Sequence, residues 1–214
     1  MEIEKIKCPG CGHMIETQLQ DFTDAAESPQ DKEKIKSGEF FMVECSECGE
    51  KIFAEHPLMY TDSEKDLHIY LAPEHEDDLL EELNGIPLPE DIPASEGIFR
   101  VVSDGAALLE KIMIFDAGRD DRVMELYKAM AFEMLKEDWP KIIRENLLYA
   151  SDDDEGEFII VWDYVNAAGE QLTMEFDEEL YGRLEADYGA ALSLPKGEYA
   201  EVNAEWLAER IDVK

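Results

Sequence analysis

The most regular hydrophobic pattern in the chain lies between residues 123 and 134. Apolar side chains recur there at positions i, i+3, i+4, i+7, i+8 and i+11: Val123, Leu126, Tyr127, Met130, Ala131 and Met134. This spacing predicts an α-helix with one continuous apolar face. Asp120 or Asp121 can cap its first turn, and Trp139-Pro140 closes it. We expect the apolar face to pack in a core, and a methionine-bearing groove for a partner is the alternative.

Shorter patterned segments surround this helix. Four of them show the alternation typical of strands: 98–102, 146–150, 158–165 and 171–176. The last two are predicted to form a hairpin around residues 166–169. Asp104, Asp177 and Asn203 each precede a helical pattern, where a side-chain oxygen can accept hydrogen bonds from the first backbone N–H groups.

The N-terminal half is richer in predicted strands, which cover five segments: 2–8, 14–19, 40–44, 51–60 and 67–71. A short helix is expected from Pro29 to Ile35, ended by Gly38, and a second one over residues 74–83. Residues 86–93 then hold three prolines, a density that breaks helices and central strands alike. We predict a linker or an extended strap there.

The four cysteines form two C-x-x-C pairs, each followed by glycine: Cys8-Pro9-Gly10-Cys11-Gly12 and Cys45-Ser46-Glu47-Cys48-Gly49. The glycine can adopt positive φ, so that the loop turns back and both sulfurs point at one metal. Two such loops facing each other place four thiolates in the tetrahedral arrangement of structural Zn²⁺ sites. We therefore predict one structural zinc ion bound by Cys8, Cys11, Cys45 and Cys48.

Other interpretations of the cysteines are weaker. A single C-x-x-C pair could be a thioredoxin-like redox centre, but two matched pairs favour a metal. Disulfides are disfavoured because no secretory signal is visible and the chain is long enough to build a core. His13 and His56 lie near the pairs and could replace a thiolate, but four cysteines already complete the ligand set.

The chain carries 53 acidic and 19 basic residues, a formal net charge of -34. Such a surface repels nucleic-acid phosphates and anionic membranes, so we expect neither as a ligand. The simple explanation of the charge is solubility or a salt-rich habitat. The sharper hypothesis is a basic protein partner, which the acidic surface would bind, for example by mimicking DNA. No apolar stretch is long enough to cross a bilayer, and reduced, paired cysteines point to the cytoplasm.

The cysteine loops and their surroundings resemble the CpXC family, bacterial proteins named for their paired cysteines. The supporting segments are residues 8–12, 37–41, 45–49 and 56–62, and the similarity continues through 99–102 and 108–112 to about residue 136. Ser46 stands where the second loop would often carry proline, which costs rigidity but no ligand. The resemblance implies a zinc ribbon with the four cysteines as its metal positions, and it implies no known activity.

These patterns together predict an α+β fold in three parts. Residues 1–85 form a β-rich zinc ribbon with a helical insertion between its two knuckles. Residues 86–96 form a proline-rich acidic linker. Residues 97–214 form an acidic α+β region with two helices, a β-hairpin and C-terminal helices.

No motif in the chain predicts catalysis. Residues 151–156 resemble a calcium loop only in part, because Trp162 stands at the twelfth position, where an EF-hand needs a bidentate glutamate. The four histidines all lie in the ribbon half, and no phosphate loop, dinucleotide fingerprint, G-x-S-x-G or H-E-x-x-H is present. Four thiolates would also leave zinc no open position for water.

The first functional hypothesis is a cytoplasmic structural-zinc protein whose acidic surface meets a protein partner. One alternative is an enzyme that uses carboxylates in a cleft between the two halves. Another is an acidic regulator, or nucleic-acid mimic, that binds a basic protein.

Overall fold

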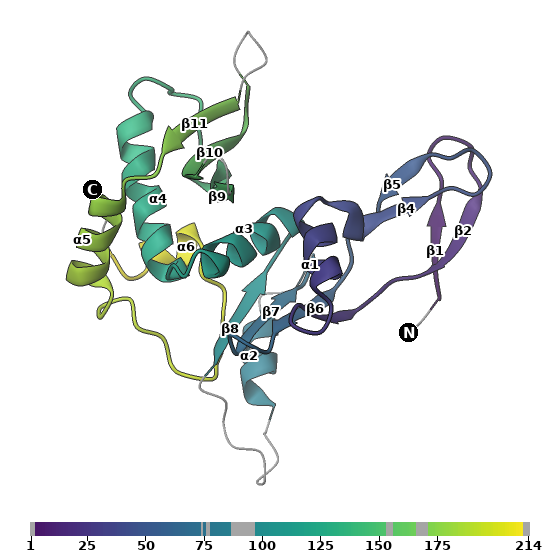
Figure 1. The fold of residues 1–214 in the computed structure, drawn as a ribbon, viewed down its shortest axis with the longest axis horizontal. Helices are drawn as coiled ribbons and strands as arrows, with labels where there is room; N and C mark the ends of the chain where they lie inside the picture. Colours follow the sequence, from purple (N-terminus) through teal and green to yellow (C-terminus); the bar gives the residue numbers. More distant parts are fainter. Residues whose placement is uncertain are drawn as a thin grey trace. The chain divides into compact units, whose positions relative to one another are not determined.

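The computed structural model describes residues 3–73, 75, 78–86, 97–152, 156–165 and 171–211, without the side chains of residues 152 and 162–165. The chain is organised as two compact units. Unit 1 comprises residues 1–108 and 196–200, and unit 2 comprises residues 109–195 and 201–214. Figure 1 traces helices and strands through both units, which confirms the predicted α+β class.

Unit 1 begins with two antiparallel hairpins. β1 (Ile3–Lys7) pairs with β2 (Met14–Gln18), and β4 (Met42–Glu44) pairs with β5 (Lys51–Phe53). Each C-x-x-C loop is the turn of one hairpin. Strand alternation places apolar residues on the inner faces, where Ile15, Val43 and Ile52 pack with two of the cysteines in one small core. This is the ribbon-like start that the sequence predicts.

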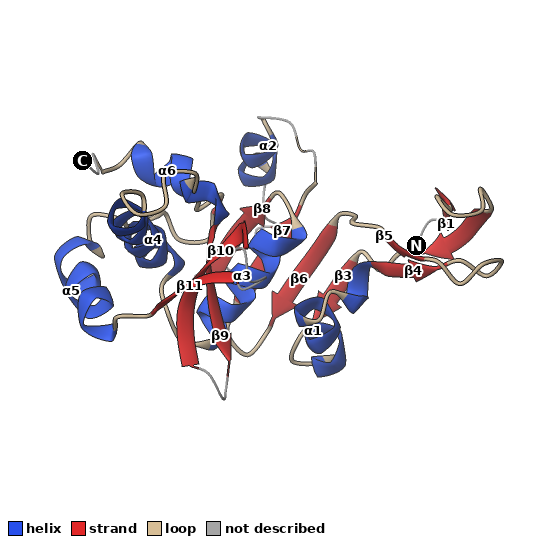
Figure 2. Ribbon diagram, turned by 90° about the horizontal axis from the view of Figure 1, so that it is seen from above, coloured by secondary structure: helices blue, strands red, loops and turns tan. Residues whose placement is uncertain are grey.

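A five-stranded sheet forms most of the remainder of unit 1, in the order β12-β8-β7-β6-β3. Figure 2 labels β8, β7, β6 and β3 of this sheet. The strands are β3 (Phe22–Asp24), β6 (Leu58–Asp62), β7 (Leu67–Leu71), β8 (Ile98–Val102) and β12 (Tyr199–Ala200). β6 and β7 are antiparallel, and all other neighbours are parallel. The helical elements that lie wholly in the described part of this unit are α1 (Pro29–Lys36), the 3₁₀ turn η1 (Glu39–Phe41) and α2 (Leu79–Gly85).

The structure corrects three expectations for unit 1. Residues 51–60 form two strands in different sheets, and the four residues between them, which include the buried His56, have no regular secondary structure. Of the strand predicted over residues 40–44, the first two residues belong to η1. β3 was not predicted, since residues 21–38 are mostly polar, and it is held by its parallel pairing with β6.

Several predicted segments fall outside the described residues. Residues 87–96 of the proline-rich segment do so, and the predicted boundaries at 85 and 97 therefore stay a prediction. The same holds for residues 153–155 of the acidic loop and for the hairpin connection at 166–169. The helix predicted over 74–83 is described from Leu79 onward.

Unit 2 combines helices with a three-stranded antiparallel sheet in the order β11-β10-β9. The helices are α3 (Gly105–Asp116, which begins in unit 1), α4 (Asp121–Leu135), α5 (Glu178–Tyr188) and α6 (Ala204–Ala208). The strands are β9 (Leu147–Asp152), β10 (Gly156–Val165) and β11 (Gln171–Glu175), and the 3₁₀ turn η2 (Arg144–Asn146) precedes them. Within the described residues, no helix combines the length and apolar character needed to span a membrane.

Side-chain caps begin four of these helices as predicted, at Asp104, Asp120, Asp177 and Asn203. Each side-chain oxygen accepts a hydrogen bond from a backbone N–H two or three residues later, at 2.8 or 2.9 Å. These bonds satisfy N–H groups that have no partner inside the helix. The starts of these four helices are therefore encoded locally.

The helix α4 is buried on more than its predicted face. Val123, Leu126, Tyr127 and Ala131 are buried, as expected for a core stripe, whereas Met134 near the end is 62% exposed. The same helix also buries Asp121, Glu125 and Lys128, which the apolar pattern does not reveal. Buried charges on a core helix need partners inside the protein.

Candidate metal centre

The four cysteines of the two knuckles come together. The Sγ atoms of Cys8 and Cys48 lie 3.6 Å apart, as do those of Cys11 and Cys45. All four sulfurs lie within 4.8 Å of one another. Cys8 and Cys45 are buried, and the other two are exposed, so the cluster has one side covered by protein and one side facing solvent.

The two knuckles share one backbone conformation. In each, the N–H of the first cysteine donates at 2.8 Å to the carbonyl oxygen five residues later. The glycine that follows the second cysteine donates its N–H back to the carbonyl of the first, at 2.9 Å from Gly12 and 2.8 Å from Gly49. Both glycines have left-handed φ values, 77° and 74°, where a side chain would be strained. This is the turn that the C-x-x-C-G pattern predicts.

The electrostatics of the cluster favour a bound cation. The backbone N–H of Cys11 lowers the pKa of the Cys8 thiol to about 7. At Cys48 the N–H of Glu50 favours the thiolate, but the sulfurs of Cys11 and Cys8 outweigh it, and the pKa of Cys48 rises to about 12. Four thiolates this close repel one another unless they share a positive ion.

The sulfur spacing fits tetrahedral coordination. Metal–sulfur bonds of about 2.3 Å give a tetrahedron with sulfur–sulfur edges of about 3.8 Å. The two shortest cross-knuckle separations, both 3.6 Å, are close to this edge. Four soft sulfur donors therefore form a possible site for one thiophilic metal ion.

The histidines near the knuckles are not part of this group, which among the described residues consists of the four cysteines. His56 is buried, with Nδ1 2.9 Å from the carbonyl oxygen of Ala54 and Nε2 3.0 Å from that of Gln20. Its ring also packs against Phe41, with 5.4 Å between centroids. His56 therefore links backbone segments of unit 1.

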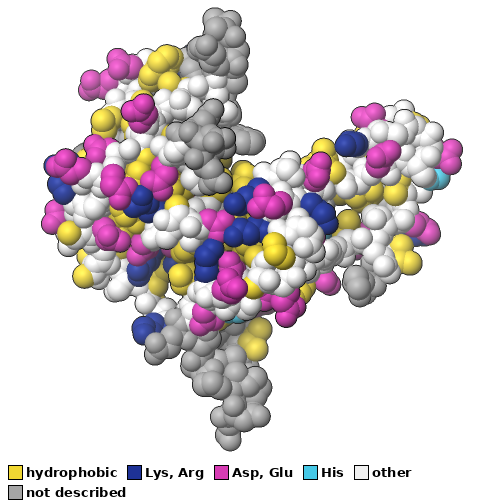
Figure 3. Space-filling view, in the orientation of Figure 1, with side chains coloured by type: hydrophobic (Ala, Val, Ile, Leu, Met, Phe, Trp, Pro, Cys, Tyr) yellow, Lys and Arg dark blue, Asp and Glu magenta, His cyan; other side chains and the backbone are white. Residues whose placement is uncertain are grey.

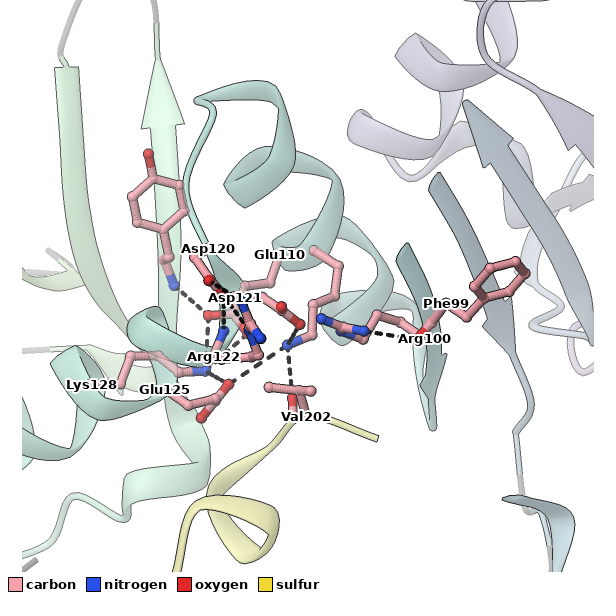
Figure 4. A network of polar contacts seen from close by, with 11 residues as sticks. Phe99, Arg100, Glu110, Asp120, Asp121, Arg122, Glu125, Lys128 and Val202 are labelled. Carbon is pink, nitrogen blue, oxygen red and sulfur yellow. Dashed lines mark hydrogen bonds and ion pairs between the residues drawn. The ribbon is translucent and has the colours of Figure 1, made fainter. Parts of the chain in front are cut away.

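Sequence reasoning missed a second cluster of charged side chains, in unit 2. Its members are Glu110, Lys111, Asp121, Glu125 and Lys128, all buried. Figure 4 labels the three acidic members and Lys128. The three from α4 are spaced i, i+4 and i+7, which places them on one helix face. That spacing was visible in the sequence, but charged residues in this pattern normally mark a solvated face.

The CpXC family model, described as CpXC protein, matches residues 6–128, more than half of the chain. The match covers both knuckles and ends within α4, somewhat before the limit of about residue 136 expected from the sequence. No curated protein and no solved structure matches the chain. From its paired cysteines and the extent of this match, the chain belongs to the CpXC family.

Proposed function

We propose that this protein binds one Zn²⁺ ion as a structural element of its ribbon, with Cys8, Cys11, Cys45 and Cys48 as ligands. The observation that carries the proposal is the convergence of four sulfurs from two knuckles within 4.8 Å. Thiolates at tetrahedral spacing suit zinc, and four protein ligands leave no position for a reacting water. The proposed role of the ion is therefore structural rather than catalytic.

The rest of the ribbon offers little folding free energy. Its hairpins are two-stranded, and such hairpins are marginally stable in water. Their shared core is limited to Ile15, Val43 and Ile52 around two sulfurs. Structural zinc sites supply about 10–16 kcal/mol of apparent binding free energy. We therefore expect metal binding to drive the folding of this part of the chain.

The test combines metal analysis of the purified protein with titration of the metal-free protein by Co²⁺. We expect one zinc ion per purified chain. Co²⁺ added to the metal-free protein should give strong sulfur-to-cobalt charge-transfer bands, and Zn²⁺ should then displace the cobalt. Replacing a ligand, as in Cys11→Ser, should weaken these bands, whereas His13→Ala should leave them unchanged. Recovery of iron in place of zinc, which four cysteines can also hold, would overturn the choice of metal.

The acidic surface supports a second proposal, that the protein meets a basic protein partner. Acidic residues outnumber basic ones by 53 to 19, and Figure 3 shows Asp and Glu side chains spread over the visible face. Such a field attracts cationic partners over distance and raises their association rate. The thiol-based centre needs a reducing environment, so we place this interaction in the cytoplasm.

A pull-down from native lysate at low and high salt tests this second proposal. Retention of a basic protein that falls as salt rises is the expected result, because salt screens exposed charges. Retention that is independent of salt would contradict an electrostatic interaction. The alternative of an enzyme gains no support from Glu110, whose pKa is raised by burial, because this carboxylate is enclosed and bonded to Lys128.

A further inference from the structure

Unit 2 encloses five charged side chains between α3 and α4. Glu110 and Lys111 come from α3, and Asp121, Glu125 and Lys128 come from α4. Their side chains are between 0% and 7% exposed. Charges this deep are costly unless each is paired and hydrogen-bonded. Each of the five charges therefore needs a partner inside unit 2.

The charges form a continuous chain of contacts. Lys111 Nζ lies 3.0 Å from Asp121 Oδ2 and 3.9 Å from Glu125 Oε1. Lys128 Nζ lies 2.8 Å from the same Glu125 oxygen and 3.0 Å from both carboxylate oxygens of Glu110. Burial alone would lower the pKa of Lys128, but the two glutamates raise it above its usual value, so the ammonium form persists.

Two backbone groups from later in the chain bond to this cluster. The N–H of Tyr149 donates to Glu110 Oε1 at 2.7 Å. Lys111 Nζ donates to the carbonyl oxygen of Val202 at 2.7 Å. Tyr149 lies in β9, the edge strand of its sheet, and Val202 directly precedes Asn203, the N-cap of α6. Glu110 thus bonds an edge strand, where a buried N–H would otherwise lack a partner.

The charged residues of the cluster precede their backbone partners in the sequence. All five charged residues lie within the segment matched by the family, 6–128, whereas both backbone partners lie after it. The later segments also bury apolar side chains, among them Leu147, Tyr149 and Leu207, and α4 contacts both β9 and α6. Apolar burial supplies the attraction, and the charges select which backbone groups can dock.

We propose that the charged face of α3 and α4 is a docking surface whose occupant is the C-terminal part of this same chain. Glu110 binds the edge of β9 by accepting a hydrogen bond, and Lys111 binds the segment that leads into α6 by donating one. The two arms are the contact of Glu110 with Tyr149 and the contact of Lys111 with Val202. They act separately, because each bonds a different backbone segment. This inference does not depend on the identity of the metal.

The test is amide hydrogen exchange, measured by NMR on the full-length protein. Glu110→Met removes the acceptor for Tyr149, and we expect exchange of the Tyr149 amide to become about tenfold faster or more, since a buried donor is left without a partner. The Leu207 amide in α6, which donates to Asn203, should keep its rate. Lys111→Met should produce the opposite pattern, with faster exchange at Leu207 and little change at Tyr149.

Two further sets of variants complete the test. Lys136→Met removes a partly exposed ion pair between the C-cap residue of α4 and Glu133, and it should change neither amide. Should a methionine variant fail to fold, Glu110→Gln and Lys111→Arg retain an acceptor and a donor, and each should preserve protection at its own amide. Equal acceleration of both amides in both variants, or no acceleration in either, would overturn the two-arm docking surface.

Discussion

The Sγ atoms of Cys8 and Cys48 lie 3.6 Å apart, although 40 positions separate the two residues in the chain. The contact crosses from one knuckle to the other, as does the contact between Cys11 and Cys45. Few apolar side chains join the two hairpins otherwise. Their association should therefore depend on the ion that the sulfurs share.

Removal of the metal by a strong chelator should unfold the hairpins β1–β2 and β4–β5 and spare unit 2. The reason is that unit 2 has its own core, including Val123, Tyr127 and Ile159, whereas the ribbon core is small. Two-dimensional NMR would show collapse of the ribbon amide signals with retention of those from β10. The control is the same chelator saturated with zinc. Persistent ribbon signals after complete metal removal would refute the structural role.

Alanine at Gly49 should weaken zinc affinity, and alanine at Gly10 should not. Gly49 has a φ of 74°, and left-handed backbone costs a non-glycine residue about 1–2 kcal/mol. A Cβ at Gly10 would lie 3.6 Å from Glu50 Oε2 and 3.8 Å from Cys48 Sγ, which is ordinary contact. Competition with a chromophoric zinc chelator measures the difference. Equal affinities of the two variants would argue against the turn geometry as the cause.

Asp31→Asn should lower the stability of unit 1 at neutral pH, and the difference from the unmodified protein should vanish in acid. Lys34 donates to this buried carboxylate at 2.8 Å and, with help from Gln20 and Thr23, holds its pKa below the usual value of an aspartate. A depressed carboxylate pKa contributes stability above the unfolded value, which is lost as the pH falls through the folded value.

The measurement for Asp31 is denaturant unfolding of both proteins across pH 2 to pH 7, with a loss at neutral pH of about 1–3 kcal/mol expected from the weakened charged hydrogen bonds. Comparing the two proteins at each pH removes the effect of the many other carboxylates. A difference that stays constant down to the lowest pH would show that Asp31 acts through packing alone.

Arg119→Lys should destabilise unit 2. The Arg119 guanidinium donates to Glu157 at 2.7 and 3.2 Å and to Glu178 at 2.8 Å, and its central carbon lies 5.1 Å from the ring centres of Phe176 and Tyr181. Lysine has neither the planar fork nor the stacking surface. We expect a loss of about 1–3 kcal/mol in the free energy of unfolding.

The matched control for Arg119 is Arg183→Lys on α5, an exposed position where a change within about 0.5 kcal/mol is expected. Urea unfolding followed by fluorescence gives both values. If the two variants lose the same stability, the bidentate contacts of Arg119 contribute nothing measurable.

Features of this protein that depend on neighbours in the chain were predictable from the sequence. The helix caps at Asp104, Asp120, Asp177 and Asn203 are local hydrogen bonds. A short polar residue directly before a helical pattern of apolar residues predicts such a cap. The knuckles are likewise local, since a C-x-x-C-G segment closes its own turn. Their pairing into one cluster was also predictable, because the thiolates of two matched loops together form the ligand set of one tetrahedral metal ion.

Other features were decided only when distant segments met. β3 is a strand because its backbone pairs with β6, with Phe22 opposite Met59, and its own polar composition gives no sign of this. Glu110 and Lys128 are buried because each neutralises the other across two helices, whereas either one alone would seek water. Sequence patterns show which side chains of a single segment are unfavourable in water and where that segment can form a turn. The partner that offsets the burial of a charge, or completes an edge strand, exists only in the folded chain.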